Sequence, residues 1–97
     1  MQERIKPLFE KIRALPDNEE KVKQLNNLAE EFMNNDLNRF ERYTYEAMEL
    51  SKKLNYMPGQ VQANIHLGRF FYLKSNPQNA LKFFQLAHQL AVENDLK

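Results

Sequence analysis

Two histidines and two acidic clusters are the side chains whose types and spacing could support chemistry in this sequence. Neither His66 nor His88 has a histidine or acidic residue three or four positions away, which is the spacing at which one helix holds a metal ion. The acidic clusters, 17–20 and 30–31, fall at a helix start and on a polar helix face. Catalytic carboxylates require a pocket instead. We therefore expect no metal site and no catalysis by paired carboxylates.

The other common catalytic motifs are also missing from the sequence. The chain has no cysteine and only two glycines, Gly59 and Gly68. Disulfides, zinc ribbons, cysteine nucleophiles and glycine-rich phosphate loops are therefore excluded. There is no Gly-x-Ser-x-Gly nucleophile elbow either. These absences predict a protein that is not an enzyme and that binds no cofactor.

Size and composition indicate one small domain. Apolar residues make up 42% of the 97 residues, and the formal net charge of +1 argues against a general nucleic-acid binder. No apolar run reaches the roughly 18 residues that a membrane-spanning helix requires, so no membrane partner is expected. Charges recur through residues 1–11, unlike a secretory signal, and the lack of cysteine fits a reducing compartment. We expect a cytoplasmic location.

Apolar residues recur at steps of three and four in five segments, and no segment alternates with a period of two. This spacing predicts an all-α fold of amphipathic helices joined by short turns. The expected helices are Gln2–Leu15, a segment between Asp17 and Asn34, Asn38–Leu54, Gln60–Lys74 and a segment from Pro77 onward. The expected buried positions in the first four are Ile5, Leu8, Phe9, Ile12 and Leu15; Val22, Leu25, Leu28, Ala29 and Phe32; Phe40, Tyr43, Ala47, Leu50 and Leu54; and Val61, Ile65, Gly68, Phe71 and Tyr72.

Capping and turn residues set the expected helix ends. We predict that Asp17 caps the second helix, with Glu20 as the reciprocal partner of a capping box. Asn55 is expected to adopt the left-handed conformation that ends the third helix. Pro58 and Gly59 then predict a turn, because a proline keeps the residue before it out of helical geometry. Asn76 is expected to cap the fifth helix.

The last two helices carry a pattern of small and aromatic residues that matches a known repeat. The matching residues, within 61–94, are Leu67, Gly68, Phe71, Ala80, Phe84 and Ala87. At these spacings the segment resembles one tetratricopeptide repeat, in which Gly68 and Ala80 let two helix backbones approach and Phe84 fills the space beside them. Asn64 and Val92 depart from the family's pattern, at positions where it often has Trp and Pro.

The preceding helix pair resembles a weaker copy of the same repeat. Ala29, Phe40 and Thr44 stand at its glycine, small and aromatic positions. The copies are further apart than the family's usual period of about 34 residues. This long form is similar to repeats attached to bacterial signalling proteins. The resemblance implies five helices in a right-handed α-α superhelix of antiparallel pairs, as a single domain over 1–97. Its parts are a leading helix (1–16), a first repeat (17–56) and a second repeat (57–97).

The resemblance also implies a binding surface, because the first helix of each pair lines the concave side of such an array. The expected partner-binding stripe is Lys23, Asn26, Asn27, Glu30, Met33, Gln62, Ile65, His66, Arg69 and Tyr72. Both histidines are expected to lie at the helix surface and not to bind a metal ion. The Lys and Asn clamp with which some family members hold a C-terminal carboxylate is absent. No acidic residue lies between Leu50 and Val92, so the partner is expected to be an acidic peptide or protein face.

The fifth helix offers a second apolar surface. Ala80, Phe84, Ala87 and Ala91 are expected to face the fourth helix, which leaves Leu81, Phe83, Leu86 and Leu90 uncovered. Either the chain is a fragment of a longer protein, or this face pairs two copies as a homodimer. The expected function is protein–protein recognition, as a regulatory or scaffold segment of a bacterial signalling protein. The alternatives are a homo-oligomerisation module and a small helical nucleic-acid binder that uses the basic second repeat.

Overall fold

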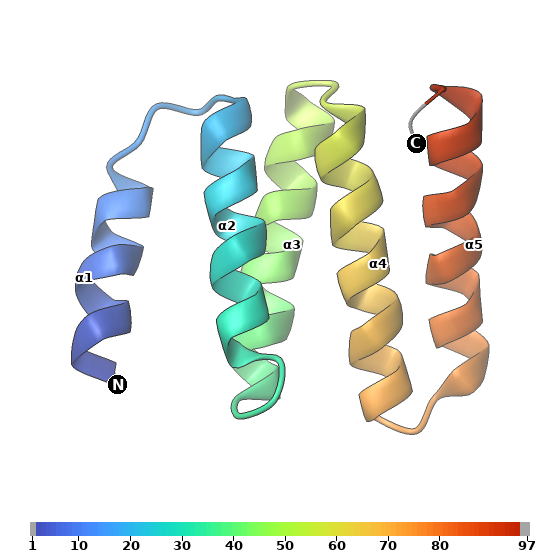
Figure 1. The fold of residues 1–97 in the computed structure, drawn as a ribbon, viewed down its shortest axis with the longest axis horizontal. Helices are drawn as coiled ribbons and strands as arrows, with labels where there is room; N and C mark the ends of the chain where they lie inside the picture. Colours follow the sequence, from blue (N-terminus) through green and yellow to red (C-terminus); the bar gives the residue numbers. More distant parts are fainter. Residues whose placement is uncertain (1, 96–97) are drawn as a thin grey trace.

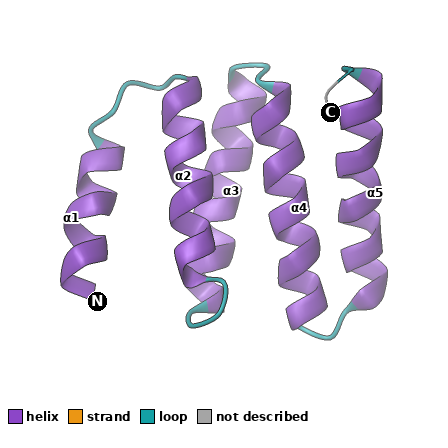
Figure 2. Ribbon diagram, in the orientation of Figure 1, coloured by secondary structure: helices purple, strands orange, loops and turns teal. Residues whose placement is uncertain are grey.

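The structure, a computed structural model, describes residues 2–95 of the chain and the side chains of residues 8–95. The five helices are α1 (Gln2–Arg13), α2 (Glu19–Phe32), α3 (Leu37–Lys53), α4 (Met57–Leu73) and α5 (Pro77–Glu93). Consecutive helices run in opposite directions, with α1 and α5 at the two edges and α3 behind α2 and α4 (Figure 1). Short loops join them, and the described residues include no strand (Figure 2). The predicted all-α fold of five helices is confirmed.

The start of α2 differs from the prediction. Asn18, and not Asp17, is the N-cap: its side chain accepts a hydrogen bond from the backbone N–H of Lys21 at 3.1 Å. Asp17 instead accepts from the Lys21 ammonium at 3.1 Å, and Glu20 accepts from Gln24 at 2.9 Å. The predicted capping box is therefore wrong. The helix begins one residue later than expected, which brings the Asn18 side chain within reach of a free N–H in the first turn.

The connection between α3 and α4 is partly as predicted. Asn55 has a φ of 54°, as expected for a left-handed C-terminal residue, and the next N–H, of Tyr56, donates to the carbonyl of Ser51 at 2.8 Å. The turn predicted at Pro58 and Gly59 is wrong, because α4 already begins at Met57. A proline in the first helical turn removes only an N–H that has no partner within the helix.

Most of the predicted core of α1–α3 is confirmed. All five expected residues of α2 are buried, as are Phe40, Tyr43 and Ala47 of α3, while Leu50 and Leu54 are half-buried. Ile12 of α1 is buried, and Leu8 and Phe9 pack against the same cluster. The ring centroids of Phe9 and Tyr43 lie 4.8 Å apart, which ties α1 to α3. The side chain of Ile5 lies outside the described residues.

The predicted core face of α4 is largely wrong. Tyr72 is 69% exposed, and Val61, Ile65 and Phe71 are only half-buried; of the predicted set, Gly68 alone is buried. The buried residues of α4 are Gly59, Gln60, Ala63, Asn64, His66, Leu67, Gly68 and Phe70. This helix lies between α2 and α3 on one side and α5 on the other (Figure 1). Because α4 is buried on two sides, its polar residues Gln60, Asn64 and His66 also lie in the interior. The spacing of apolar residues alone does not predict their burial.

The packing of α5 on α4 depends on one close approach. A Cβ atom at Gly68 would lie 2.5 Å from Cε1 of Phe84, so the ring of Phe84 takes its present position because residue 68 has no side chain. Ala80 and Ala87 are buried as predicted. Phe83 was expected to be uncovered, and this is wrong: it packs against the buried cluster formed by Met48, Ala63 and Leu67. Its ring also stacks on Phe71, with centroids 5.4 Å apart and an interplanar angle of 2°.

Candidate binding groove between α2 and α4

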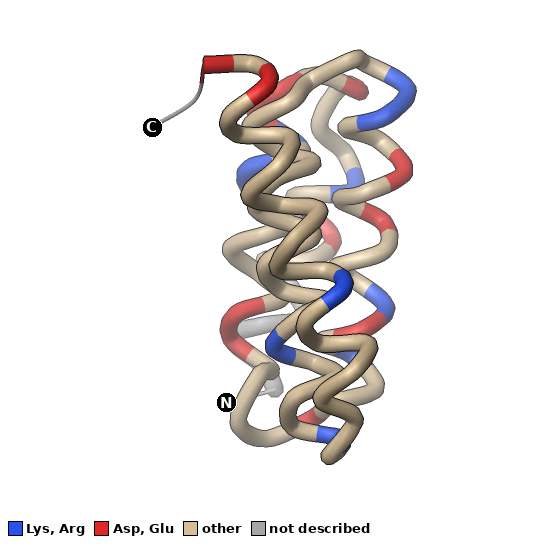
Figure 3. The backbone as a smooth tube through the Cα atoms, turned by 90° about the vertical axis from the view of Figure 1, so that its right-hand side faces the viewer, with Lys and Arg blue, Asp and Glu red and all other residues tan. Residues whose placement is uncertain are grey.

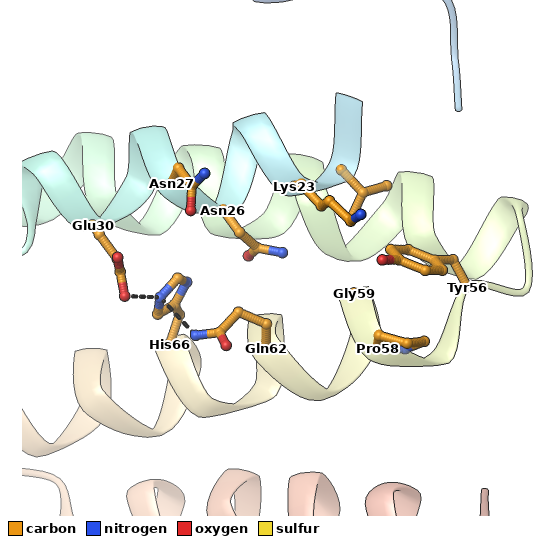
Figure 4. Close-up of a pocket in the computed structure, with 10 residues that line it drawn as sticks. Lys23, Asn26, Asn27, Glu30, Tyr56, Pro58, Gly59, Gln62 and His66 are labelled. Atoms are coloured by element: carbon orange, nitrogen blue, oxygen red, sulfur yellow. Dashed lines mark hydrogen bonds and ion pairs between the residues drawn. The ribbon is translucent and has the colours of Figure 1, made fainter. Parts of the chain in front are cut away.

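A pocket of about 460 Å³ separates α2 from the first half of α4 (Figure 4). The residues that line it are Val22, Lys23, Asn26, Asn27, Glu30, Tyr56, Pro58, Gly59, Gln62 and His66. We call this pocket the α2–α4 groove. Residues 26, 27 and 30 lie three, four and seven positions after residue 23, so the four share one face of α2. Residues 62 and 66, four positions apart, share the opposing face of α4.

The structure brings together six of the ten residues expected in a partner-binding stripe: Lys23, Asn26, Asn27, Glu30, Gln62 and His66. Arg69 adjoins the groove, because its Nη1 lies 3.7 Å from Oε1 of Glu30. Met33 lines a separate depression with Leu37 and Leu73. Ile65 and Tyr72 do not line the groove. The expected stripe is therefore divided, and its compact part is the α2–α4 groove.

Four lining residues were missed by the sequence analysis. Val22 was assigned to the core, Pro58 and Gly59 were assigned to a turn, and Tyr56 was not considered. The early start of α4 brings its first turn against α2. A Cβ at Gly59 would lie 2.5 Å from Cγ1 of Val22 and 3.0 Å from Cβ of Ser51. The glycine thus permits the close approach of α4 to α2 beside Val22.

His66 is the central side chain of the groove, and the expectation that it lies at the helix surface is wrong. It is 0% exposed, because it projects from α4 into the space between the helices, with its ring at the edge of Phe40. Its Nε2 lies 3.3 Å from Oε1 of Glu30 and 3.1 Å from Nε2 of Gln62. The contact with Glu30 joins α4 to α2.

The partners of His66 indicate which ring nitrogen carries the proton. An ionised carboxylate can only accept, so the Nε2–H tautomer of His66 satisfies Glu30. The structure places Nε2 of Gln62 against the same ring nitrogen, and a half rotation of that amide would present its oxygen to the Nε2–H instead. Burial lowers the pKa of His66 below its ordinary value of 6.5; the hydrogen bond and negative charge of Glu30 oppose this shift, and the positive charge of Arg69 adds to it. The imidazole is therefore neutral at pH 7, and its Nδ1 is an acceptor.

Two buried acceptors of the groove lack a donor. Within the described part of the chain, neither Nδ1 of His66 nor Oδ1 of Asn26 has a hydrogen-bond partner. Asn26 is only 4% exposed, and its amide points from α2 toward α4, facing the imidazole of His66 (Figure 4). Buried polar atoms almost always have a partner, and an unpaired one destabilises the fold by about 1–3 kcal/mol.

The two ends of the groove differ in charge. Lys23 and Glu30 are seven residues apart on α2, about 10 Å along the helix axis at 1.5 Å per residue. The Lys23 end also lies beside the start of α4, whose N-cap, Tyr56, makes no side-chain capping bond, so this end favours negative charge.

The α5 side of the molecule is mainly basic. Seen from that side, the nearest helices carry basic residues, and acidic residues follow only at the end of α5 (Figure 3).

A second groove lies between α3, α4 and α5, with a volume of about 340 Å³. Its lining residues are Tyr45, Met48, Glu49, Lys52, Gln60, Asn64, Leu67, Phe83, Leu86 and Leu90. Three of the four residues expected in an uncovered oligomer face, Phe83, Leu86 and Leu90, thus line this groove. The fourth, Leu81, is 57% exposed.

In residues 8–95, no three His, Asp or Glu side chains gather in a group that could hold a metal ion. None of the helices in this part of the chain has the length and apolar character needed to cross a bilayer. No protein-family model matches the sequence, and neither a curated protein nor a solved structure matches it.

Proposed function

We propose that this protein is a protein–protein interaction module of the tetratricopeptide-repeat type, which binds an extended segment of its partner in the α2–α4 groove. One observation carries the proposal: polar residues of α2 and α4, the first helices of the two expected repeats, line a single groove. The ring of Phe84 against Gly68 supports the repeat assignment, since the signature pattern requires that close packing. The resemblance to long-period repeats further suggests a regulatory or scaffold segment of a larger bacterial signalling protein.

The shape and charge of the groove suit a short extended peptide. The span of about 10 Å between Lys23 and Glu30 equals about three residues of extended chain at 3.3 Å each. Amide side chains from Asn27 and Gln62 line the same span and can bond to a peptide backbone. The Lys23 end, beside the start of α4, favours an acidic residue of the partner.

Site-specific photo-crosslinking tests this proposal. A benzophenone amino acid at the exposed groove position Asn27 is compared with one at Arg42, which is exposed on α3 away from every groove described above. The partner segment captured from position 27 is then synthesised and titrated against the wild type and Lys23→Glu. We expect capture from position 27 alone and binding at least about threefold weaker in the variant. Equal capture from both positions, or equal affinity of both proteins, would contradict the proposal.

Self-assembly through α5 is a second candidate function. Leu81 is 57% exposed and Val92 is 64% exposed on that helix, while Leu86 is also accessible. Exposed apolar side chains on one helix indicate a contact surface. Light scattering over a concentration series, on the wild type and on Leu81→Glu and Leu86→Glu, tests it. A dimer that either substitution dissociates supports this candidate, and a monomer at high concentration removes it.

A further inference from the structure

We infer that the α2–α4 groove binds a primary carboxamide between Asn26 and His66, and that this group is the side chain of an Asn or Gln residue of the bound peptide. This inference rests on the proposed function, which it deepens by naming the side chain that is recognised. It depends on two buried acceptors that face each other from opposite helices: Oδ1 of Asn26 on α2 and Nδ1 of His66 on α4.

The need for a donor follows from the contacts already made. The Nε2–H of His66 is engaged by Glu30, so Nδ1 presents a lone pair. Asn26 is almost fully buried, so bulk water has little access to its oxygen. Both atoms are closed off from solvent, so a ligand reaches them only when side chains of the groove move aside, and it must then supply two hydrogen-bond donors at once. A hydroxyl has one donor, whereas the planar NH₂ of a carboxamide has two, directed away from each other.

The charges around the acceptors favour a neutral donor over a cation. An ammonium or guanidinium group also carries several donors, but Arg69 lies 3.7 Å from Oε1 of Glu30 and already balances that carboxylate. Lys23 adds a further positive charge to the same groove. A cationic ligand would be repelled by both Arg69 and Lys23, and it would lose its hydration on entering the groove. The amide N–H groups of Gln62 and Asn27, which line the same groove, remain to donate to the carboxamide oxygen.

Nuclear magnetic resonance on the full chain tests the inference. The probes are N-acetylglutamine methylamide and its matched acid, N-acetylglutamate methylamide, at pH 7.5. We expect the glutamine probe to shift the Nδ1 resonance of His66 saturably, and to bind about tenfold more tightly than the glutamate probe. The exposed ring of His88 serves as the internal control and should not shift. Equal binding of both probes, or no binding of either, overturns the inference.

The free protein gives a further decisive measurement. If the Nδ1 resonance of His66 already shows a hydrogen bond without a probe, the amide of Asn26 donates to it directly, and the inference is wrong. Free L-glutamine separates two sources of the same group: tighter binding of the free amino acid than of the blocked probe would overturn recognition within a peptide. We expect the blocked probe to bind more tightly.

Variants on the two walls identify the acceptors. His66→Phe removes Nδ1 while keeping a ring beside Phe40, and Asn26→Leu removes Oδ1 with little change in size. Each should lower the affinity for the glutamine probe about tenfold, while His88→Phe should leave it unchanged. If one variant fails to fold, as judged by circular dichroism, the other decides. Loss of the glutamine preference with retained crosslinking at position 27 would refute this inference alone. Binding of the probe without any crosslinked partner would refute the proposed function instead.

Discussion

The imidazole Nε2 of His66 lies 3.3 Å from the carboxylate Oε1 of Glu30, and the contact joins α4 to α2 across 36 residues of sequence. One partner is fully buried, and the other is about half exposed. The charges of partly exposed groups beside the groove therefore shift the pKa of the buried imidazole. Because Arg69 approaches the same carboxylate oxygen, the ionisation of His66 reports on two opposite charges at once.

Substitution of those two charges should move the pKa of His66 in opposite directions. Glu30 raises this pKa by a hydrogen bond and by its charge, so Glu30→Gln should lower it further. Arg69 lowers it by its charge, so Arg69→Gln should raise it. A proton NMR titration of the His66 ring measures both. If both variants shifted the pKa of His66 in the same direction, the opposing charge effects of Glu30 and Arg69 would be contradicted.

Folding stability should fall on mild acidification because of His66. Its pKa in the folded protein is lowered by burial below the ordinary 6.5, so between the two values the unfolded chain binds more protons. The free energy of unfolding is therefore highest above about pH 6.5 and decreases as the pH falls through the folded-state pKa. Urea denaturation at pH 7.5 and 5.5 measures this loss.

Two variants separate His66 from other causes of this pH dependence. His66→Phe should flatten the change between pH 7.5 and 5.5, whereas His88→Phe should keep it, since that ring stays in water on folding. The lowered pKa of Asp17, which its hydrogen bond and ion pair with Lys21 produce, affects stability only below about pH 4. If the free energy of unfolding of His66→Phe still changed with pH as in the wild type, a group other than His66 would cause the pH dependence.

The two glycines should differ in their tolerance of a methyl group. At Gly59 an added Cβ meets the fully buried Val22 and Ser51 and the half-buried Tyr56, so Gly59→Ala should destabilise the fold by about 2 kcal/mol. At Gly68 the three nearest atoms all belong to the ring of Phe84, which is partly exposed and can move. Gly68→Ala should therefore cost less, because the ring of Phe84 can rotate away from the added methyl group. Thermal denaturation ranks the two variants, and the reverse order would contradict the packing described.

The N-cap of α2 can be located by a pair of neighbouring substitutions. Asn18→Ala removes the side-chain bond to the Lys21 N–H and should lower the free energy of unfolding by about 1 kcal/mol. Asp17→Ala removes only ion pairs of an exposed carboxylate with Lys21 and Lys53, which contribute little in water. Chemical denaturation of both variants at low salt makes the comparison. A larger effect at Asp17 would restore it as the cap.

Several features of the fold could be predicted from the sequence because they are local. The left-handed Asn55, the cap at Asn76 and the buried face of α2 depend on residues within a few positions of one another. The side chain of Asn76 accepts from the Asn79 N–H at 3.3 Å, as a cap residue followed by a proline indicates. Helix number and the polar residues of α2 that face a neighbour follow from the same short-range spacing.

Only the tertiary structure decided which side of α4 is buried and what the groove contains. A helix packed between neighbours on two sides buries a wide arc of its surface, so apolar spacing no longer identifies its core face. Gln60, Asn64 and His66 therefore lie inside, while Tyr72 lies in water. The contact of His66 with Glu30 and the pair of unpartnered acceptors exist because α2 and α4 meet across the intervening α3. The residues next to Glu30 and His66 in the sequence do not indicate that these two side chains meet.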